Sequence, residues 1–557
     1  MPRLAPALCC LALLAAPALS SAAAPAGPRV VVDPARHDGL RAAFNAHFYP
    51  ERLAPGDAAL AAAHRHEDRG ACLTGLVADL KANWEIFTDE EQAEMTAALA
   101  PWKGELTDPL GPPAVDGAPP PPDAPCFGYT YDNHLDSDHF SITWQDGVLT
   151  DTEAADFMES LEFSWTTEVD EQNWREPAGV GRDPMMIIVE EGGYAGAYTT
   201  IDQCPDGRYV PYIVAYEASF FDDTWYKVMA CHEFNHACQY SYGMGHEFWW
   251  WEATATYMEE QVYPSVNDWA NMVYSYSQRP DLGMNSWDVR NNDTNLFWHT
   301  YGMGIWGFYL DQHVGGMELI QDTWDYSRTH GSGYDLWMPD VIDGVGQEFD
   351  DIYLGFITTN AVLDYDERNY YQTPADQNFD SLPVEGGPKN NRAPQSLGQN
   401  YLRFDKDLGG EGKILEVTFD GDDGPFWYAA LVAGTRTVDT VVTFELDDAN
   451  MGTATIPFDG SSDIVLVVSP KDEDAQGYRY RWDTDEGFQY TFSARYYEEE
   501  VPDTATPGGD DGAVADDNTV SGSKDEGKSG LCATATPAAS LGLLLGALGL
   551  AAGRRRR

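Results

Sequence analysis

His232 and His236 lie four residues apart, and Glu233 directly follows the first histidine. On an α-helix, residues at positions i and i+4 share one face, so both imidazoles can reach one metal ion. Glu233 lies on the flank of the pair, where its carboxylate can hold a water molecule at that ion. The alternative is that these are ordinary helix histidines. The H-E-x-x-H spacing favours a metal site at which water is activated.

A catalytic zinc ion needs three protein ligands and one position open for water. Glu252 follows His232 by twenty residues, a gap that suits a helix, a turn and a returning helix. We expect that second helix over residues 249–260, where Ala253 and Ala255 would allow a close approach to the first. Glu252 is therefore the predicted third ligand. The competing carboxylates are those of Glu247, Glu259 and Glu260.

The two stretches together resemble a known family. H-E-F-x-H-x-x-Q at 232–239, followed by W-x-E-A-x-A at 250–255, resembles the gluzincins, in which a glutamate on a second helix is the third ligand. Within that family the chain is similar to secreted bacterial metalloproteases that carry a C-terminal sorting tag. The resemblance spans roughly residues 70–375. It implies a zincin-like catalytic domain, one Zn²⁺ held by His232, His236 and Glu252, and Glu233 as the catalytic carboxylate.

One position departs from the family pattern. A carboxylate often lies one turn after the third ligand and orients a histidine, but Thr256 occupies that place here. We expect Glu259, one turn further along, to take this role. An oxyanion donor is also needed, and Tyr301 is the favoured candidate over His299 and His246. For each of these three, the alternative is a packed or surface residue.

The expected reaction is hydrolysis of peptide bonds by a secreted zinc metalloendopeptidase. Zinc-activated water attacks the carbonyl, and Glu233 passes the proton of that water to the leaving amine. One alternative is a non-catalytic surface or binding protein whose metal is structural or lost. A second is a metal-dependent hydrolase that acts on other bonds.

The charge balance limits the partners. Thirty-three basic residues against 91 acidic ones give a formal net charge of −58. Such a chain repels nucleic acid and anionic membranes, so we exclude a nucleic-acid role. Proteins or peptides are the expected substrates.

Both ends of the chain predict export. Residues 1–24 form a signal peptide with Arg3 before an apolar run. An acidic tether at 498–531 precedes residues 532–557, in which Cys532, an apolar run and an arginine cluster resemble Myxo-CTERM sorting tags. A C-terminal membrane anchor is the alternative. We expect an extracellular or cell-surface protein at the outer membrane.

Between its ends the chain predicts an α+β fold in several parts. Residues 25–110 form a helical region that is a possible propeptide, and residues 111–125 form a Pro-rich linker. Residues 126–376 form the zincin-like catalytic domain. Short strands separated by Asp and Gly turns indicate an all-β sandwich at 395–497.

Export permits disulfides, and a disulfide from Cys72, with Cys126 as the candidate partner, is the favoured interpretation. The alternative is that the Cys72 thiolate blocks the zinc ion until activation. Cys231 and Cys238 are expected in the core or in a disulfide rather than as ligands. The acidic turns are also candidate Ca²⁺ sites, with solvated turns as the favoured interpretation; their residues are Asp420, Asp422, Asp423, Asp483 and Asp485.

Overall fold

The computed structural model describes residues 34–49, 52, 71–99, 131–180, 183–192, 196–204, 207–220, 224–286, 294–331, 334, 336–374, 377–389, 392–473 and 487–498. The expected signal peptide, linker, tether and C-terminal tag lie outside these residues. Helices and several sheets are both present, which confirms the α+β class. In the described part of the chain, no helix combines the length and the apolar character needed to cross a membrane.

A mixed six-stranded sheet packs against the helix that contains His232 and His236. Its strand order is β1-β5-β6-β4-β3-β2. The strands are β1 (Ala71–Cys72), β2 (Asn133–Asp136), β3 (Phe140–Trp144), β4 (Met185–Glu190), β5 (Gly196–Gln203) and β6 (Tyr209–Tyr216). The central strands β3, β4 and β6 run parallel. Their residues are almost all buried, as expected of strands that are covered on both faces.

The N-terminal region contributes helices and one short strand. The helices are α1 (Pro34–Phe48), α3 (Thr74–Ala82), η2 (Trp84–Ile86) and α4 (Asp89–Leu99). The Thr88 hydroxyl accepts from the Glu91 backbone and the Glu91 carboxylate accepts from the Thr88 backbone, a capping box that starts α4. The strand β1 was not expected in this region. It pairs in parallel with β5, so this region shares the sheet of the following residues.

A series of helices follows β3, and it includes the helix that the sequence predicts at 249–260. They are α5 (Asp151–Trp165), η3 (Thr166–Glu171), η5 (Glu217–Phe220), α6 (Trp225–Gln239), η6 (Tyr240–Tyr242), α7 (Phe248–Val262), α8 (Trp269–Gln278), α9 (Thr294–Gly302), α10 (Gly304–Tyr309), η7 (Leu310–Gly315), α11 (Gly316–His330), α12 (Met338–Gly344) and α13 (Phe349–Val362). Gly243 follows η6 with a φ of 95°, a conformation that favours glycine.

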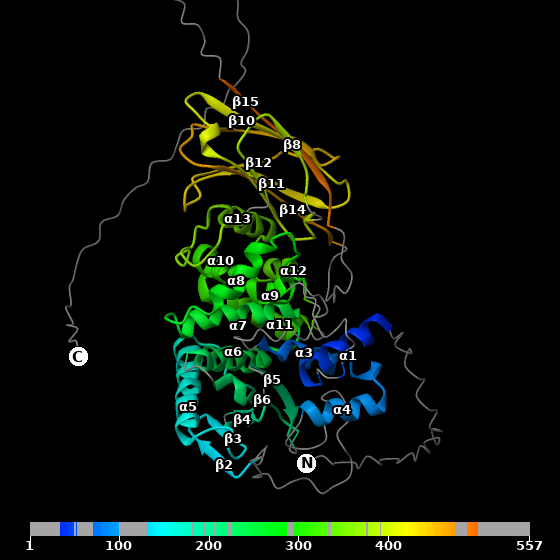
Figure 1. Cartoon of the computed structure of the whole chain (residues 1–557), viewed down its shortest axis with the longest axis vertical. Coiled ribbons are helices and arrows are strands. Elements are labelled where there is room, and N and C mark those ends of the chain that lie inside the picture. The colour runs from blue at the N-terminus through cyan, green and yellow to red at the C-terminus, as the bar shows by residue number, and fades with distance from the viewer. Residues whose placement is uncertain are drawn as a thin grey trace, which may run out of the picture. The chain divides into compact units, whose positions relative to one another are not determined.

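Helix α6 lies between the sheet and α7. It packs against β5 and β6 on one side and against α7 on the other (Figure 1). Its residues from Val228 to Gln239 are all buried. The three tryptophans at the start of α7, Trp249 to Trp251, are buried as well, so they pack in the core.

The C-terminal strands form two facing sheets. Their orders are β13-β10-β15-β8 and β12-β11-β14-β9-β7. The strands are β7 (Gln377–Phe379), β8 (Val384–Gly386), β9 (Asn400–Phe404), β10 (Lys413–Gly421), β11 (Phe426–Ala433), β12 (Thr440–Thr443), β13 (Met451–Pro457), β14 (Ile464–Lys471) and β15 (Tyr490–Glu498), with η8 (Lys406–Leu408) between β9 and β10. Side chains from both sheets share one apolar core, the packing of a β-sandwich.

Candidate metal centre

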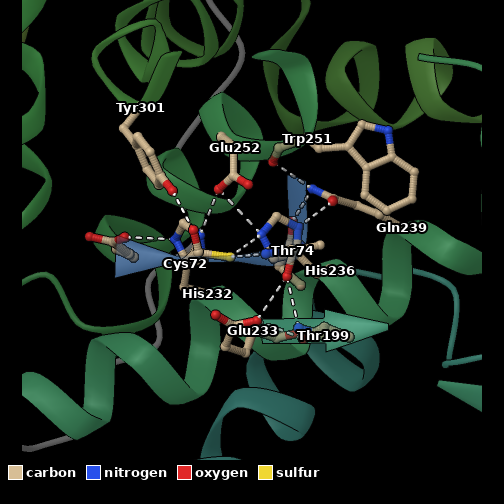
Figure 2. A network of polar contacts seen from close by, with 12 residues as sticks. Cys72, Thr74, Thr199, His232, Glu233, His236, Gln239, Trp251, Glu252 and Tyr301 are labelled. Carbon is tan, nitrogen blue, oxygen red and sulfur yellow. Dashed lines mark hydrogen bonds and ion pairs between the residues drawn. The ribbon is translucent and has the colours of Figure 1, made fainter. Parts of the chain in front are cut away.

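Helices α6 and α7 bring three predicted ligands together. The Nε2 atom of His232 lies 3.2 Å from Oε2 of Glu252, and Nε2 of His236 lies 3.5 Å from the same oxygen. All three side chains are buried. Figure 2 shows the two rings and the Glu252 carboxylate directed toward one point. The predicted spacing of 232, 236 and 252 therefore corresponds to one site in space.

Each imidazole is oriented through its other nitrogen. His232 Nδ1 donates to Oε1 of Glu259 at 2.9 Å, and His236 Nδ1 donates to Oε1 of Gln239 at 2.8 Å. A proton on Nδ1 leaves the Nε2 lone pair free and directed at the shared point. Glu259 occupies the role predicted for it. Gln239 belongs to the H-E-F-x-H-x-x-Q pattern, but the pattern alone does not predict this contact with His236.

Gln239 is itself fixed by a buried network. Its amide nitrogen donates to Asn235 Oδ1 at 2.8 Å and to the Trp251 carbonyl at 3.1 Å. Asn235 in turn donates to Glu168 Oε2 at 2.9 Å. The network connects α6 to the start of α7 and to η3, so it sets the position of His236 relative to Glu252.

The electrostatics of the cluster favour a cation. Burial by itself would lower the pKa of His232, but hydrogen bonds and charge from Glu252 and Glu259 raise it to about 10. Burial raises the pKa of Glu252, yet the neighbouring His236 and His232 lower it to about 2. Burial raises the pKa of Glu259 to about 7 against the effect of His232. Two buried carboxylates are thus compensated by positive charge on imidazole, which a bound cation can replace.

Glu233 lies beside the cluster but not among its ligand atoms. Its Oε2 accepts from the Thr199 hydroxyl at 2.7 Å and from the Thr74 hydroxyl at 3.2 Å. Thr199 is on β5 and Thr74 begins α3, so sequence reasoning missed both. Glu233 lines one pocket together with His232, Cys72 and Tyr301. The carboxylate is therefore held in place next to the ligands without being one of them.

The disulfide expected at Cys72 is wrong. Cys72 is a free thiol, and its Sγ lies 3.3 Å from Nε2 of His236 (Figure 2). Strand pairing of β1 with β5 brings the sulfur to the histidines, a contact that local sequence does not reveal. Cys231 and Cys238 are free and buried on α6, as expected of core residues, while Cys204 is disulfide-bonded.

Tyr301 is the oxyanion candidate that lies at the cluster. Its ring stacks near His232, with 6.0 Å between centroids, and its hydroxyl donates to the Cys72 carbonyl at 2.9 Å. The other two candidates are elsewhere in the core. His299 Nε2 donates to the Gly283 carbonyl and His246 Nε2 donates to the Thr323 carbonyl, so each has a packing role.

The competing carboxylates are also engaged away from the cluster. Glu247 accepts from the Trp249 and Asn285 side chains, and Glu260 accepts from the Trp269 indole. Of the three competitors, only Glu259 contacts a predicted ligand, and it contacts His232 at Nδ1.

Among the acidic turns, the Asp422 carboxylate accepts from the Gln489 backbone, while Asp483 and Asp485 lie outside the described residues. The Ca²⁺ sites stay a prediction.

The donor set fits a zinc ion. A tetrahedral zinc with bonds of about 2.0–2.3 Å holds its ligand atoms about 3.3–3.8 Å apart. The Glu252 oxygen lies 3.2 and 3.5 Å from the Nε2 atoms of His232 and His236, and the Cys72 sulfur lies 3.3 Å from Nε2 of His236. All four ligand atoms lie within 4.8 Å of one another. Imidazole and thiolate ligands together suit zinc better than magnesium or calcium.

Comparison with known proteins adds no family assignment. The sequence matches no model of a protein family, and no curated protein is similar to it.

Proposed function

We propose that this chain is an exported zinc metallopeptidase of the gluzincin type that hydrolyses peptide bonds. One observation carries the proposal: His232, His236 and Glu252 converge through Nε2 and carboxylate oxygen, with Glu233 beside them but not among the ligand atoms. A structural metal site needs no such extra carboxylate. A hydrolytic site does, because a base must accept the proton of the attacking water.

The roles of the side chains follow from their positions. When bound, zinc supplies a Lewis acid that activates water and polarises the substrate carbonyl. Glu233 takes the proton from the attacking water and delivers it to the leaving amine. The Thr199 hydroxyl holds the Glu233 carboxylate in the orientation that this transfer needs. The Tyr301 hydroxyl, beside His232, donates to the oxyanion that develops on the carbonyl oxygen.

A second function is favoured by a different observation. Cys72 adds a fourth ligand-capable atom to the cluster. Four protein ligands are typical of closed structural zinc sites, whereas catalytic sites keep one position for water. The chain would then be a non-catalytic surface or binding protein whose metal stabilises the fold.

Zinc content and peptide hydrolysis separate these functions. Four full-length chains are compared: the parent, Cys72→Ser, and each of these with Glu233→Gln. We expect one zinc per chain throughout, with casein hydrolysis in the Cys72→Ser chain that is lost on adding Glu233→Gln. Glu191→Gln, which alters an exposed carboxylate, is the matched control. Zinc-loaded Cys72→Ser that cleaves no peptide would overturn the proposal.

The bond type needs its own assay. The active chain is offered a peptide library together with a panel of simple amides and esters. Cleavage of internal peptide bonds is expected. Hydrolysis of esters alone would assign the site to another class of metal-dependent hydrolase.

A further inference from the structure

We infer that Cys72 is a fourth ligand of the bound metal and that it makes the intact chain a latent form. The inference rests on the proposed peptidase function. The Cys72 Sγ lies 3.3 Å from Nε2 of His236 and joins the two imidazoles and Glu252 in one cluster. The Thr74 backbone N–H donates to the same sulfur at 3.3 Å, which orients it. The sulfur thus occupies the position that a hydrolytic zinc site leaves for water.

The residues around Cys72 also engage the other catalytic groups. The Cys72 carbonyl accepts the Tyr301 hydroxyl at 2.9 Å, and the Thr74 hydroxyl donates to the Glu233 carboxylate at 3.2 Å. Cys72 and Thr74 therefore contact the predicted ligand His236, the oxyanion donor and the general base (Figure 2). A role for Cys72 as a ligand of a structural metal would not account for the contacts with Tyr301 and Glu233.

Strand β1 covers the sheet next to the cluster. Ala71 and Cys72 pair in parallel with Gly196 and Ala197 of β5, and the Leu73 N–H donates to the Ala197 carbonyl at 2.8 Å. In the described sheet, β5 has no other strand on this side. The free edge of a sheet is a general place for an extended peptide to add as a strand. The chain's own β1 occupies that edge with only two residues, so a substrate strand can displace it once the sulfur no longer holds it at the metal, as in Cys72→Ser.

Residues 71–82, which we call the covering segment, are held against the sheet by apolar packing and by hydrogen bonds. In and before α3, five apolar side chains are buried: Leu73, Leu76, Val77, Ala78 and Leu80. Lys81 Nζ donates to the Thr200 hydroxyl at 2.7 Å and to the Ile201 carbonyl at 3.1 Å, which fixes the end of α3 to β5. Because the thiol belongs to the same chain, its effective concentration at the metal is high.

Activation is a ligand exchange. With a metal bound, Cys72 Sγ would leave it and take up one proton from solvent, which would open the fourth position to water. No oxidant or reductant is required. Withdrawal of the covering segment also releases the Tyr301 hydroxyl, the Glu233 carboxylate and the β5 edge.

The absorption spectrum of the cobalt-loaded chain tests for a bond between the metal and the Cys72 sulfur without an activity assay. Full-length chains, with the N-terminal region verified as intact by mass spectrometry, are loaded with Co²⁺. We expect the thiolate-to-cobalt charge-transfer band of the near ultraviolet in the parent and in Cys238→Ala, and no such band in Cys72→Ser. Cys238 is the matched control because it is free, buried and on α6, but outside the cluster.

Thiol alkylation of the parent requires no variant and therefore tests the same bond if Cys72→Ser fails to fold. We expect Cys72 to resist iodoacetamide in the zinc-loaded chain and to react after chelation, as mapped by peptide mass spectrometry. Peptide hydrolysis by zinc-loaded Cys72→Ser should exceed that of the parent at least ~10-fold, the factor that corresponds to about 1.4 kcal/mol in favour of the closed state.

The outcomes separate this inference from the proposed function. An equally active parent and Cys72→Ser, with no cobalt–thiolate band in the parent, would overturn latency and leave the peptidase standing. A band that depends on Cys72, with Cys72→Ser loaded with zinc yet inert, would overturn both and identify a structural four-ligand site.

Discussion

Glu259 Oε1 lies 2.9 Å from Nδ1 of His232, seven residues after Glu252 on the same helix. Seven residues are about two helical turns, so both carboxylates lie on one face of α7. Glu252 faces the Nε2 side of His232 and Glu259 faces the Nδ1 side. One helix thus supplies both a predicted ligand and the residue that orients another.

Glu259→Gln should weaken zinc binding about 10- to 100-fold, the usual effect of removing a carboxylate that orients a ligating histidine. Glu260→Gln changes the next residue, whose carboxylate accepts from Trp269 instead, and is the matched control. Competition with a chromophoric chelator measures both affinities. Equal affinities in the two variants would show that the contact with His232 does not support the metal.

Tyr301→Phe should lower kcat by roughly 10²–10³ and leave KM nearly unchanged, because the lost donor acts on the oxyanion rather than on bound substrate. The test uses the Cys72→Ser chain, in which no thiol at position 72 competes for the metal. Tyr263→Phe removes a hydroxyl that donates to Ser160 and is the control. A Tyr301→Phe chain with full kcat would assign the residue a packing role.

Metal removal should destabilise the fold, because a ligand that binds only the folded state adds RT ln(1 + [L]/Kd) to the free energy of unfolding. At free zinc of about 100 times Kd this is about 2.7 kcal/mol. Chelation should therefore lower the Tm of the parent and change that of Glu252→Gln much less. The same chelator-induced shift in both chains would mean that Glu252 is not a ligand.

The burial of His246 predicts that the folded chain loses stability in acid. Burial lowers its pKa to about 4, against the effect of the Thr323 carbonyl, while the unfolded chain has an ordinary value of about 6.5. Between these pH values the unfolded state binds a proton that the folded state does not. The free energy of unfolding therefore falls as the pH falls from 6.5 to 4, by roughly 3 kcal/mol for this group.

The control is His246→Gln, which keeps a donor for Thr323. Denaturant unfolding at several pH values should show a shallower pH dependence in this variant than in the parent. Identical slopes would indicate that folding does not change the pKa of His246.

Local patterns were sufficient for the elements that carry the site. The i, i+4 spacing placed His232 and His236 on one helix face, and the twenty-residue gap placed Glu252 on the returning helix. What local patterns could not supply is contact between distant segments. Thr199 approaches Glu233 only because β5 packs against α6, and nothing near either residue encodes that contact.

Cys72 illustrates the same limit. Export to an oxidising compartment favours a disulfide at Cys72. The pairing of β1 with β5 instead places the thiol beside His236. Gln239 is a different case, because its position three residues after His236 is a local signal. The family resemblance included it, but its role required the 2.8 Å contact with Nδ1 to be seen.

X-ray absorption at the zinc K edge tests the central claim most directly, because it reports the atoms bonded to the metal in the intact chain. The account predicts one zinc with two imidazole nitrogens, one carboxylate oxygen and one sulfur at about 2.3 Å. In Cys72→Ser the sulfur should be replaced by oxygen while both imidazoles remain. A purified chain without zinc, or a zinc shell that lacks imidazole, would contradict the assignment of His232, His236 and Glu252.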